Sequence, residues 1–248
     1  MWEDLAVRKA QPWWAALGMA AAGLIWPAKC LNCGSYRQQG YGWLCQACWE
    51  DLILCTGGTG CPLCGKDVSP YALIEDGCTS CLGQRPIWDG LCRSGVYKGV
   101  MRELILAFKH GRTELDVLLA GLANAALCVQ DWYERIDMFV PVPLHWLRRL
   151  QRGYNQAAVI ARRLRHPNAR FANVLRRTRW TASQTSMPTP KARSRNVAGV
   201  FALKGDVKGR TICLVDDVKT TGATLAQCTS ALREGGASRV YTLVLAVA

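Results

Sequence analysis

The second half of the chain alternates short apolar runs with segments whose apolar residues recur at helical spacing. A strand is expected at 91–97, and apolar runs predict further strands at 138–142, 211–215 and 240–247. Helices are predicted at 100–109, where the apolar residues share one face, at 116–129 and at 154–164; Leu225, Cys228 and Leu232 predict a last helix that ends at a glycine pair. Because strand–helix–strand alternation builds a parallel sheet with helices on both faces, this half predicts an α/β fold.

The first 95 residues are marked instead by the spacing of their cysteines. They hold 10 of the 13 cysteines, and eight of these form four C-x2-C pairs. Two thiolates spaced in this way point at one tetrahedral ion, and two pairs complete a four-sulfur zinc shell. The gaps of 11 and 13 residues within the two double pairs have the length of a short hairpin, as in a zinc ribbon. The expected ligands are Cys30, Cys33, Cys45, Cys48, Cys61, Cys64, Cys78 and Cys81.

Two other uses of these cysteines stay open at this point. A disulfide framework needs an oxidising compartment, which suits poorly the leftover thiols Cys213 and Cys228 in apolar surroundings. An iron–sulfur cluster fits regular double pairs less well than two zinc ions do. Spacing leaves the pairing of the sites undecided, although sequential pairing closes shorter loops and so costs less entropy.

The N-terminus contains 19 uncharged residues, 10–28, preceded by Arg8 and Lys9. Two prolines leave a core of 14 residues, which spans about 21 Å as a helix and falls short of the ~30 Å of a bilayer core. We therefore expect a short helix within 1–26 that docks on the protein. Peripheral contact with the inner membrane through Trp13, Trp14 and Trp26 stays open.

The charge is as uneven as the cysteine content. The net charge is +13, and residues 138–205 carry 14 basic residues and no acidic one. A solvated surface is the ordinary explanation of a charge run, but so long a segment without a carboxylate creates a sustained positive field suited to phosphates. Aromatic residues that could stack on single-stranded DNA lie in the same segment, namely Trp146, Tyr154, Phe171 and Trp180, with simple packing as the alternative.

The most informative segment is LVDDVKTTGAT, residues 214–224. A buried strand ends in Asp216 and Asp217, and a Thr/Gly turn then opens a helix, whose free N–H groups and dipole suit phosphate. The two carboxylates can accept hydrogen bonds from the hydroxyls of a ribose, with Mg²⁺ nearby. One Asp would suffice to cap the helix, so the pattern favours a ribose 5-phosphate ligand.

This segment resembles the phosphoribosyl-diphosphate (PRPP) motif of type I phosphoribosyltransferases. Together with the cysteine pairs and the segments 104–112, 140–157 and 193–201, it resembles the ComF/GntX family over nearly the whole chain. The resemblance implies that Asp216 and Asp217 hold the ribose hydroxyls. The residues implied for the phosphates are Thr220, Thr221, Gly222, Ala223 and Thr224 for the 5′-phosphate, and Val142 and Pro143 for pyrophosphate.

The same resemblance implies a mobile loop at 184–195 that closes over the site, with Gln184, Arg193 and Arg195. Lys219 departs from the small or apolar residue expected inside the motif. A transfer reaction would displace pyrophosphate from the anomeric carbon. Mg²⁺ with Lys109, Arg152 or the loop arginines would neutralise the leaving charge.

The nucleophile is not revealed by any residue. His110 and His145 are the candidate general bases, and His166 lies in a polar turn, although each is equally explained as a surface or hydrogen-bonded histidine.

These patterns together predict three parts: a docking helix at 1–26, a double zinc ribbon at 27–90 and a type I phosphoribosyltransferase-like α/β domain at 91–248. We expect a cytoplasmic, ComF-type protein that binds two Zn²⁺ and PRPP with Mg²⁺. We also expect it to support the handling of incoming single-stranded DNA in competence or DNA utilisation. The expected partners are PRPP, single-stranded DNA at 138–205, and competence or helicase proteins at the ribbon. The alternative is an active phosphoribosyltransferase acting on an unidentified base or amine.

Overall fold

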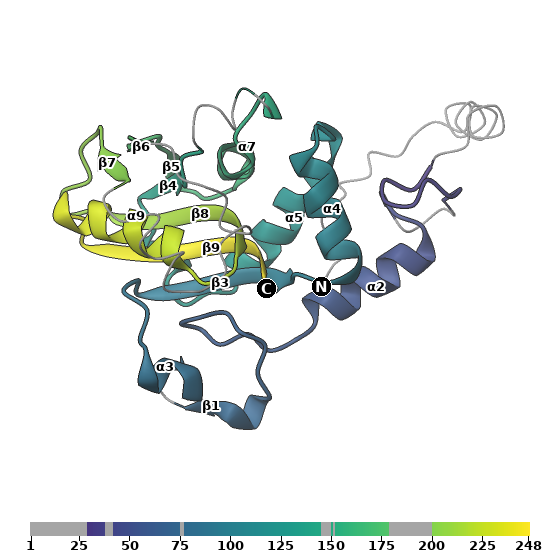
Figure 1. Cartoon of the computed structure of the whole chain (residues 1–248), viewed down its shortest axis with the longest axis horizontal. Helices are drawn as coiled ribbons and strands as arrows, with labels where there is room; N and C mark the ends of the chain where they lie inside the picture. The colour runs from purple at the N-terminus through teal and green to yellow at the C-terminus, as the bar shows by residue number, and fades with distance from the viewer. Residues whose placement is uncertain (1–28, 38–41, 75–76, 145–149, 151, 179–199) are drawn as a thin grey trace. The chain divides into compact units, whose positions relative to one another are not determined.

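The computed structural model describes residues 29–37, 42–74, 77–144, 150, 152–178 and 200–248, and Figure 1 shows the helices and strands that they form. The chain forms two compact units, Met1–Glu50 and Asp51–Ala248. The predicted docking helix at 1–26 and the predicted mobile loop at 184–195 lie outside the described residues. No helix of the described part is long and apolar enough to cross a membrane.

The second unit is built on a five-stranded sheet in which all neighbouring strands are parallel. Its strand order is β3-β9-β8-β4-β5. The strands are β3 (Gly90–Val96), β9 (Arg239–Val247), β8 (Thr211–Lys219), β4 (Met138–Pro141) and β5 (Arg170–Phe171). The two long central strands, β8 and β9, are buried along most of their length, as their continuous apolar sequence predicts. The predicted α/β fold is confirmed.

Helices cover both faces of this sheet. On one face, α9 (Ala223–Glu234) packs Leu225, Cys228 and Leu232 against residues of β8 and β9 such as Leu214 and Val244. Alternation along the strands turns the neighbouring residues to the opposite face. There the sheet contacts α4 (Gly99–Lys109), α5 (Asp116–Leu127) and α7 (Gln156–Arg163).

The other described elements are short or lie outside the five-stranded sheet. They are the helices α2 (Gln46–Thr56) and α3 (Thr79–Gly83), the 3-10 turns η1 (Pro70–Ala72), η2 (Thr113–Leu115) and η3 (Tyr133–Arg135), and the strand pairs β1 (Leu73–Ile74) with β2 (Gly77–Cys78) and β6 (Leu175–Arg177) with β7 (Phe201–Leu203). The strands β5, β6 and β7 carry too few residues for an apolar pattern to predict them.

The strand β8 is longer than its apolar run predicts. The sequence predicts its end at residue 215, but the strand continues to Lys219. Its partner β9 continues alongside it, with Asp216 opposite Val244 and Lys219 opposite Val247. Pairing with the apolar end of β9, from Val244 to Val247, therefore holds the two aspartates in extended backbone, where local sequence alone indicates a turn.

The second cysteine-rich segment packs directly on the edge strand β3. The Leu91 amide donates to the Pro62 carbonyl at 2.7 Å, and the Trp88 indole N–H donates to the Leu63 carbonyl at 2.6 Å. Gly65 has a φ of 70°, and a Cβ at this position would collide with the Leu91 side chain. This part of the ribbon is therefore fixed to the sheet by its backbone and by close contact.

Candidate functional site

The eight predicted metal ligands form two clusters, paired in sequence order. Cys30, Cys33, Cys45 and Cys48 belong to the first unit, and Cys61, Cys64, Cys78 and Cys81 to the second; within each cluster all sulfur atoms lie within 4.8 Å of one another. The Cys33–Cys45 and Cys64–Cys78 sulfurs are 3.6 Å apart, and the Cys61–Cys81 sulfurs are 3.8 Å apart. Tetrahedral zinc with Zn–S bonds of about 2.3 Å separates its sulfurs by about 3.8 Å.

These distances fit two zinc ions and are far longer than the ~2.05 Å of a disulfide bond. All 13 cysteines are free, so the disulfide alternative is wrong for this structure. Sequential pairing, which costs the least loop entropy, is the arrangement found.

The first knuckle of each cluster ends in a glycine that the sequence reading missed. Gly34 and Gly65 follow the second cysteine and have φ values of 76° and 70°. Their amides donate to the carbonyls of Cys30 and Cys61, at 3.1 and 2.8 Å. Glycine alone adopts this backbone without strain, so the signal C-x2-C-G was available in the sequence.

The two clusters differ in burial. All four cysteines of the second cluster are buried, beside Leu63, Val68 and Leu73, whereas Cys33 of the first is exposed. Burial raises the pKa of the Cys64 thiol to about 12, so this thiol holds its proton at neutral pH until a metal displaces it.

The two aspartates of β8 face different helices. The Asp217 carboxylate lies 3.1 Å from the Lys109 ammonium at the end of α4. Asp216 interacts electrostatically with Cys228 of α9, with Lys109 at longer range and with Arg177 of β6. Since side chains alternate along a strand, the carboxylates lie on opposite faces of the sheet, and their joint hold on one ribose stays a prediction.

The environment of Asp216 is unusual for a carboxyl group. Burial, and secondly the negative charge of Asp217, raise its pKa from 3.8 to about 7. Burial disfavours the charged form because low-polarity surroundings solvate it poorly. The group therefore titrates near neutrality.

The loop between β8 and α9 has the conformation that an anion site requires. Gly222 has a φ of 80°, and a Cβ there would lie 2.8 Å from the Trp88 ring. The Ala223 amide has only a long contact, 3.4 Å, to the Thr221 hydroxyl. Within the described residues, the amides of Thr221 and Gly222 donate to no backbone carbonyl. Open amides at the start of α9 are the groups that bind phosphate at helix N-termini.

The other segments implied by the resemblance gather at the same edge of the sheet. Val142, just after β4, donates its amide to the Val215 carbonyl at 2.8 Å and accepts from the Asn155 amide at 3.0 Å. Pro143 follows directly, and the Tyr154 hydroxyl donates to the Phe108 carbonyl near Lys109. The segments around 109, 142, 154 and 217 therefore converge, although they are far apart in sequence.

Gln156 is a further residue at this edge that sequence reasoning missed. It is buried at the start of α7, and its oxygen accepts from Arg152 at 3.3 Å. Its amide nitrogen has no hydrogen-bond partner among the described residues. Nothing in the sequence distinguishes this glutamine from a surface residue.

Of the remaining predicted residues, some make contacts within the protein and others lie outside the residues that the structure describes. Both ring nitrogens of His166 hydrogen-bond to backbone, and the Nδ1 of the exposed His110 lies 2.8 Å from the Leu106 carbonyl. Phe171 lies under the Arg162 guanidinium at 4.5 Å, which supports packing within the protein. Outside the described residues lie His145, Trp146, Trp180, Gln184, Arg193 and Arg195.

A parallel sheet with an acidic strand end, a Thr/Gly turn into a helix and two four-cysteine clusters defines a phosphoribosyltransferase-type domain joined to a double zinc ribbon. The family model of the double zinc ribbon domain matches residues 21–82, and that of the phosphoribosyl transferase domain matches residues 150–247.

Relatives that align with this chain over most of their length identify the family within this class of protein. Competence protein F of Haemophilus influenzae is 30% identical over 229 residues, covering 88% of this chain and 96% of that protein. DNA utilization protein YhgH of Escherichia coli K12 is 30% identical over 88% of this chain and 96% of its own length. Competence protein ComFC of Bacillus subtilis is 28% identical over 91% of this chain and 97% of its own. The chain belongs to the ComF/GntX family.

Among solved structures, purine phosphoribosyltransferase from Pyrococcus horikoshii is similar at 15% identity. The alignment has a TM-score of 0.31 and covers 52% of this chain and 73% of that one.

The cysteine clusters predict a zinc content of two ions per chain. We expect Cys64→Ser to retain about one ion and to lower the free energy of unfolding of the second unit by at least about 2 kcal/mol, because the metal orders a ribbon that packs on β3. Elemental analysis and denaturant titration measure both. The matched control, Cys33→Ser, should lose the other ion with little effect on the second unit. Two ions retained by Cys64→Ser would contradict the assignment.

The raised pKa of Asp216 predicts a pH-dependent stability. A folded pKa of about 7 against 3.8 means that the folded chain binds the extra proton, so stability falls as pH rises toward 7. We expect Asp216→Asn to gain about 2 kcal/mol more over wild type at pH 8.5 than at pH 5.5. Denaturant titrations at both pH values measure this gain. An equal gain at the two pH values would show that Asp216 is ionised throughout.

Proposed function

We propose that the chain binds PRPP with Mg²⁺ at the carboxyl edge of its sheet and acts in DNA uptake or utilisation. The observation that carries the proposal is the Asp217–Lys109 ion pair beside a phosphate loop with open amides. Ligands of open α/β sheets bind outside the carboxyl ends of the strands, where these groups lie.

The loop amides and the N-terminus of α9 would hold the 5′-phosphate, because they supply donors and a positive dipole without a competing carbonyl. Asp217 would accept from a ribose hydroxyl. Lys109, now held by Asp217 at 3.1 Å, would then be able to face the diphosphate. Mg²⁺ bound with PRPP would neutralise part of the diphosphate charge, and the carboxylates are suitable oxygen ligands for it.

The raised pKa of Asp216 makes the proposed binding of PRPP dependent on pH. With its pKa raised by burial to about 7, this carboxyl is partly protonated near neutrality in the ligand-free protein. A hydroxyl donor or a cation favours the ionised form, so ligand binding at this carboxyl releases a proton. PRPP affinity should therefore rise between pH 6 and pH 8.

The DNA role draws on the names of the relatives and on the basic segment. Within 138–205, the described Arg162, Arg170 and Arg176 are exposed, and no carboxylate lies in the segment to compete with a phosphate backbone. Arg163 differs from them because it pairs with Asp116 at 2.6 Å.

Phosphoribosyl transfer to an unidentified base or amine is the second candidate function. The lysine beside the acidic strand end favours it, because leaving-group stabilisation is the main catalytic requirement of a cation-like displacement. Pyrophosphate release distinguishes transfer from binding alone.

Calorimetry with PRPP and Mg²⁺ tests the first part. Asp217→Asn should weaken PRPP binding at least about tenfold, since it removes a hydroxyl acceptor and the partner of Lys109. The control is Asp116→Asn, which breaks a comparable pair with Arg163. Absence of PRPP binding by the wild type, or equal affinity in Asp217→Asn, would overturn the proposal. Pyrophosphate release on adding acceptors would establish transfer.

Binding of a dT oligonucleotide at several salt concentrations tests the second part. The logarithm of the affinity should fall with the logarithm of salt by about 0.7 for each phosphate contact. Combining Arg162→Gln, Arg170→Gln and Arg176→Gln should weaken binding at least about tenfold and flatten that slope. Arg233→Gln with Arg239→Gln is the control, because both of these arginines pair with Asp89. A flat salt response in the wild type would exclude DNA binding of this kind.

A further inference from the structure

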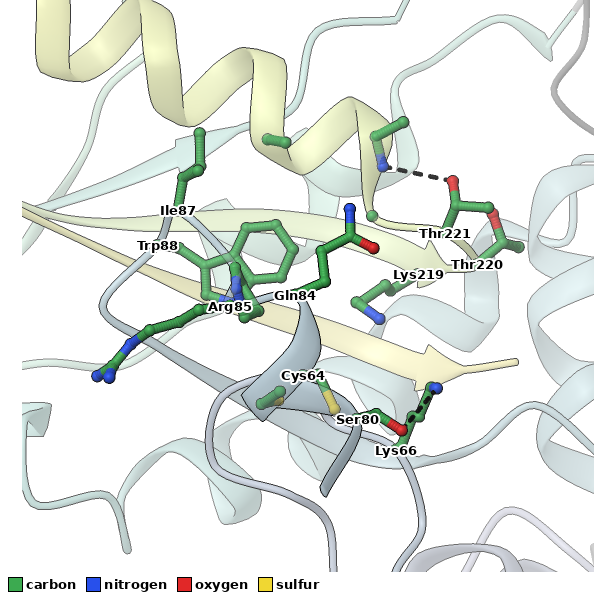
Figure 2. Close-up of a pocket in the computed structure, with 15 residues that line it drawn as sticks. Cys64, Lys66, Ser80, Gln84, Arg85, Ile87, Trp88, Lys219, Thr220 and Thr221 are labelled. Atoms are coloured by element: carbon green, nitrogen blue, oxygen red, sulfur yellow. Dashed lines mark hydrogen bonds between the residues drawn. The ribbon is translucent and has the colours of Figure 1, made fainter. Parts of the chain in front are cut away.

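A cavity of about 660 Å³ lies between the second ribbon and the phosphate loop, and Figure 2 shows its lining. One wall is formed by Lys219, Thr220, Thr221, Gly222, Ala223 and the first turn of α9. The other is formed by the ribbon and the segment after it, including Lys66, Ser80, Gln84 and Trp88. We call it the ribbon–loop cavity. Its volume is within the range of about 300–1,000 Å³ that is typical of small-molecule sites.

Lys219 is the residue that departs from the expected motif, and it lines this cavity. Only 6% of its surface is exposed. In Figure 2 its amine is directed into the space between Gln84 and the ribbon. Among the described residues, its ammonium makes no ion pair with a carboxylate, and its opposite-sign electrostatic partners are the thiols Cys61, Cys64 and Cys81 of the second cluster. A mostly buried lysine favours negative groups beside its ammonium, which the thiolates of the second cluster supply in part and an anion in the cavity would supply further.

The rest of the lining matches an anion as well. It contains no aspartate or glutamate, its only acidic groups are the cluster cysteines Cys64 and Cys81, and the loop contributes the open amides of Thr221 and Gly222. Lys66 lies at the cavity with its amine 3.2 Å from the Ser80 hydroxyl. The cavity is too large for a phosphate ion alone, and Pro86, Ile87 and Trp88 give it an apolar side that suits an attached organic group.

The ribbon wall is fixed relative to the loop. The Trp88 indole donates to Leu63 of the ribbon, and the same ring lies against Gly222 of the loop. A phosphate on the loop amides would therefore face ribbon side chains held at a constant distance.

We propose that the second zinc ribbon and the phosphate loop together form one phosphomonoester site, in which Lys219 and the ribbon residue Lys66 contact the phosphate group. The inference rests on the proposed function because it uses the same loop. It adds that the ribbon is part of the ligand site and that Lys219 is a phosphate ligand.

Titration of the zinc-loaded full chain with ribose 5-phosphate, followed by calorimetry and by ³¹P NMR, tests the inference without requiring turnover. Lys219→Met should weaken binding at least about tenfold, because it keeps the length of the side chain and removes its charge. Lys66→Met should weaken binding about threefold or more. Arg85→Gln is the matched control: Arg85 also lines the cavity, but Figure 2 shows its side chain directed away from Lys219 and Thr221, so less than a twofold change is expected.

The outcomes separate this inference from the proposed function. Ribose 5-phosphate binding that depends on Lys219 and Lys66 supports the shared site even where PRPP is not bound. If Asp217→Asn weakens PRPP binding but Lys219→Met leaves ribose 5-phosphate binding unchanged, this inference is wrong and the proposed function stands. If Lys219→Met instead lowers zinc retention and leaves phosphate binding unchanged, Lys219 is a counter-ion of the cysteine cluster and the inference is wrong. Thermal melts of each variant establish that it is folded, and Lys66→Met provides the test if Lys219→Met does not fold.

Discussion

The pairing of β8 with β9 is the constraint on which the candidate site depends. The ladder continues to the pair Lys219–Val247, and the amide of Ala248 adds a bond to the Lys219 carbonyl at 2.9 Å. It holds Asp216 and Asp217 in extended backbone at the end of a buried strand. The alternation of a strand then directs them to different faces, one toward α9 and one toward Lys109. The difference in their electrostatic environments follows from this backbone and not from their side chains, which are identical.

Much of the fold could be predicted because its signals are local. Apolar runs and helical spacing locate β3, β4, β9, α4 and α5, and the cysteine spacing locates both metal clusters. The end of β8 could not be predicted, because the residues from Asp216 onward look like a turn and are held as a strand only by a partner far away in sequence. Gln156 could not be found either, since its burial depends on packing around α7.

The position of the Lys219 side chain could not be predicted from the sequence either, although this residue lies inside the motif. The sequence marks it as a departure and predicts added charge beside a phosphate. Only the packing of the ribbon on β3 shows that this charge lies in a cavity with two walls (Figure 2). Contacts between segments more than 130 residues apart, such as Trp88 against Gly222, have no signal in a single sequence.

The position of the second ribbon follows from its small hydrophobic core, which cannot stabilise the ribbon without other interactions. Apart from its cysteines, its buried cluster contains little more than Leu63, Val68 and Leu73, which is too small to stabilise a fold alone. Zinc bound to the cluster would supply part of the missing free energy, and the hydrogen bonds that the Pro62 and Leu63 carbonyls accept from the Leu91 amide of β3 and from the Trp88 indole supply another part. The edge strand β3 in turn has backbone groups that its neighbour in the sheet does not pair, and one of them, the Leu91 amide, donates to the ribbon. Because both the metal and the contacts with β3 fix the ribbon, its lysine and polar side chains are held next to the phosphate loop, as a ligand site requires.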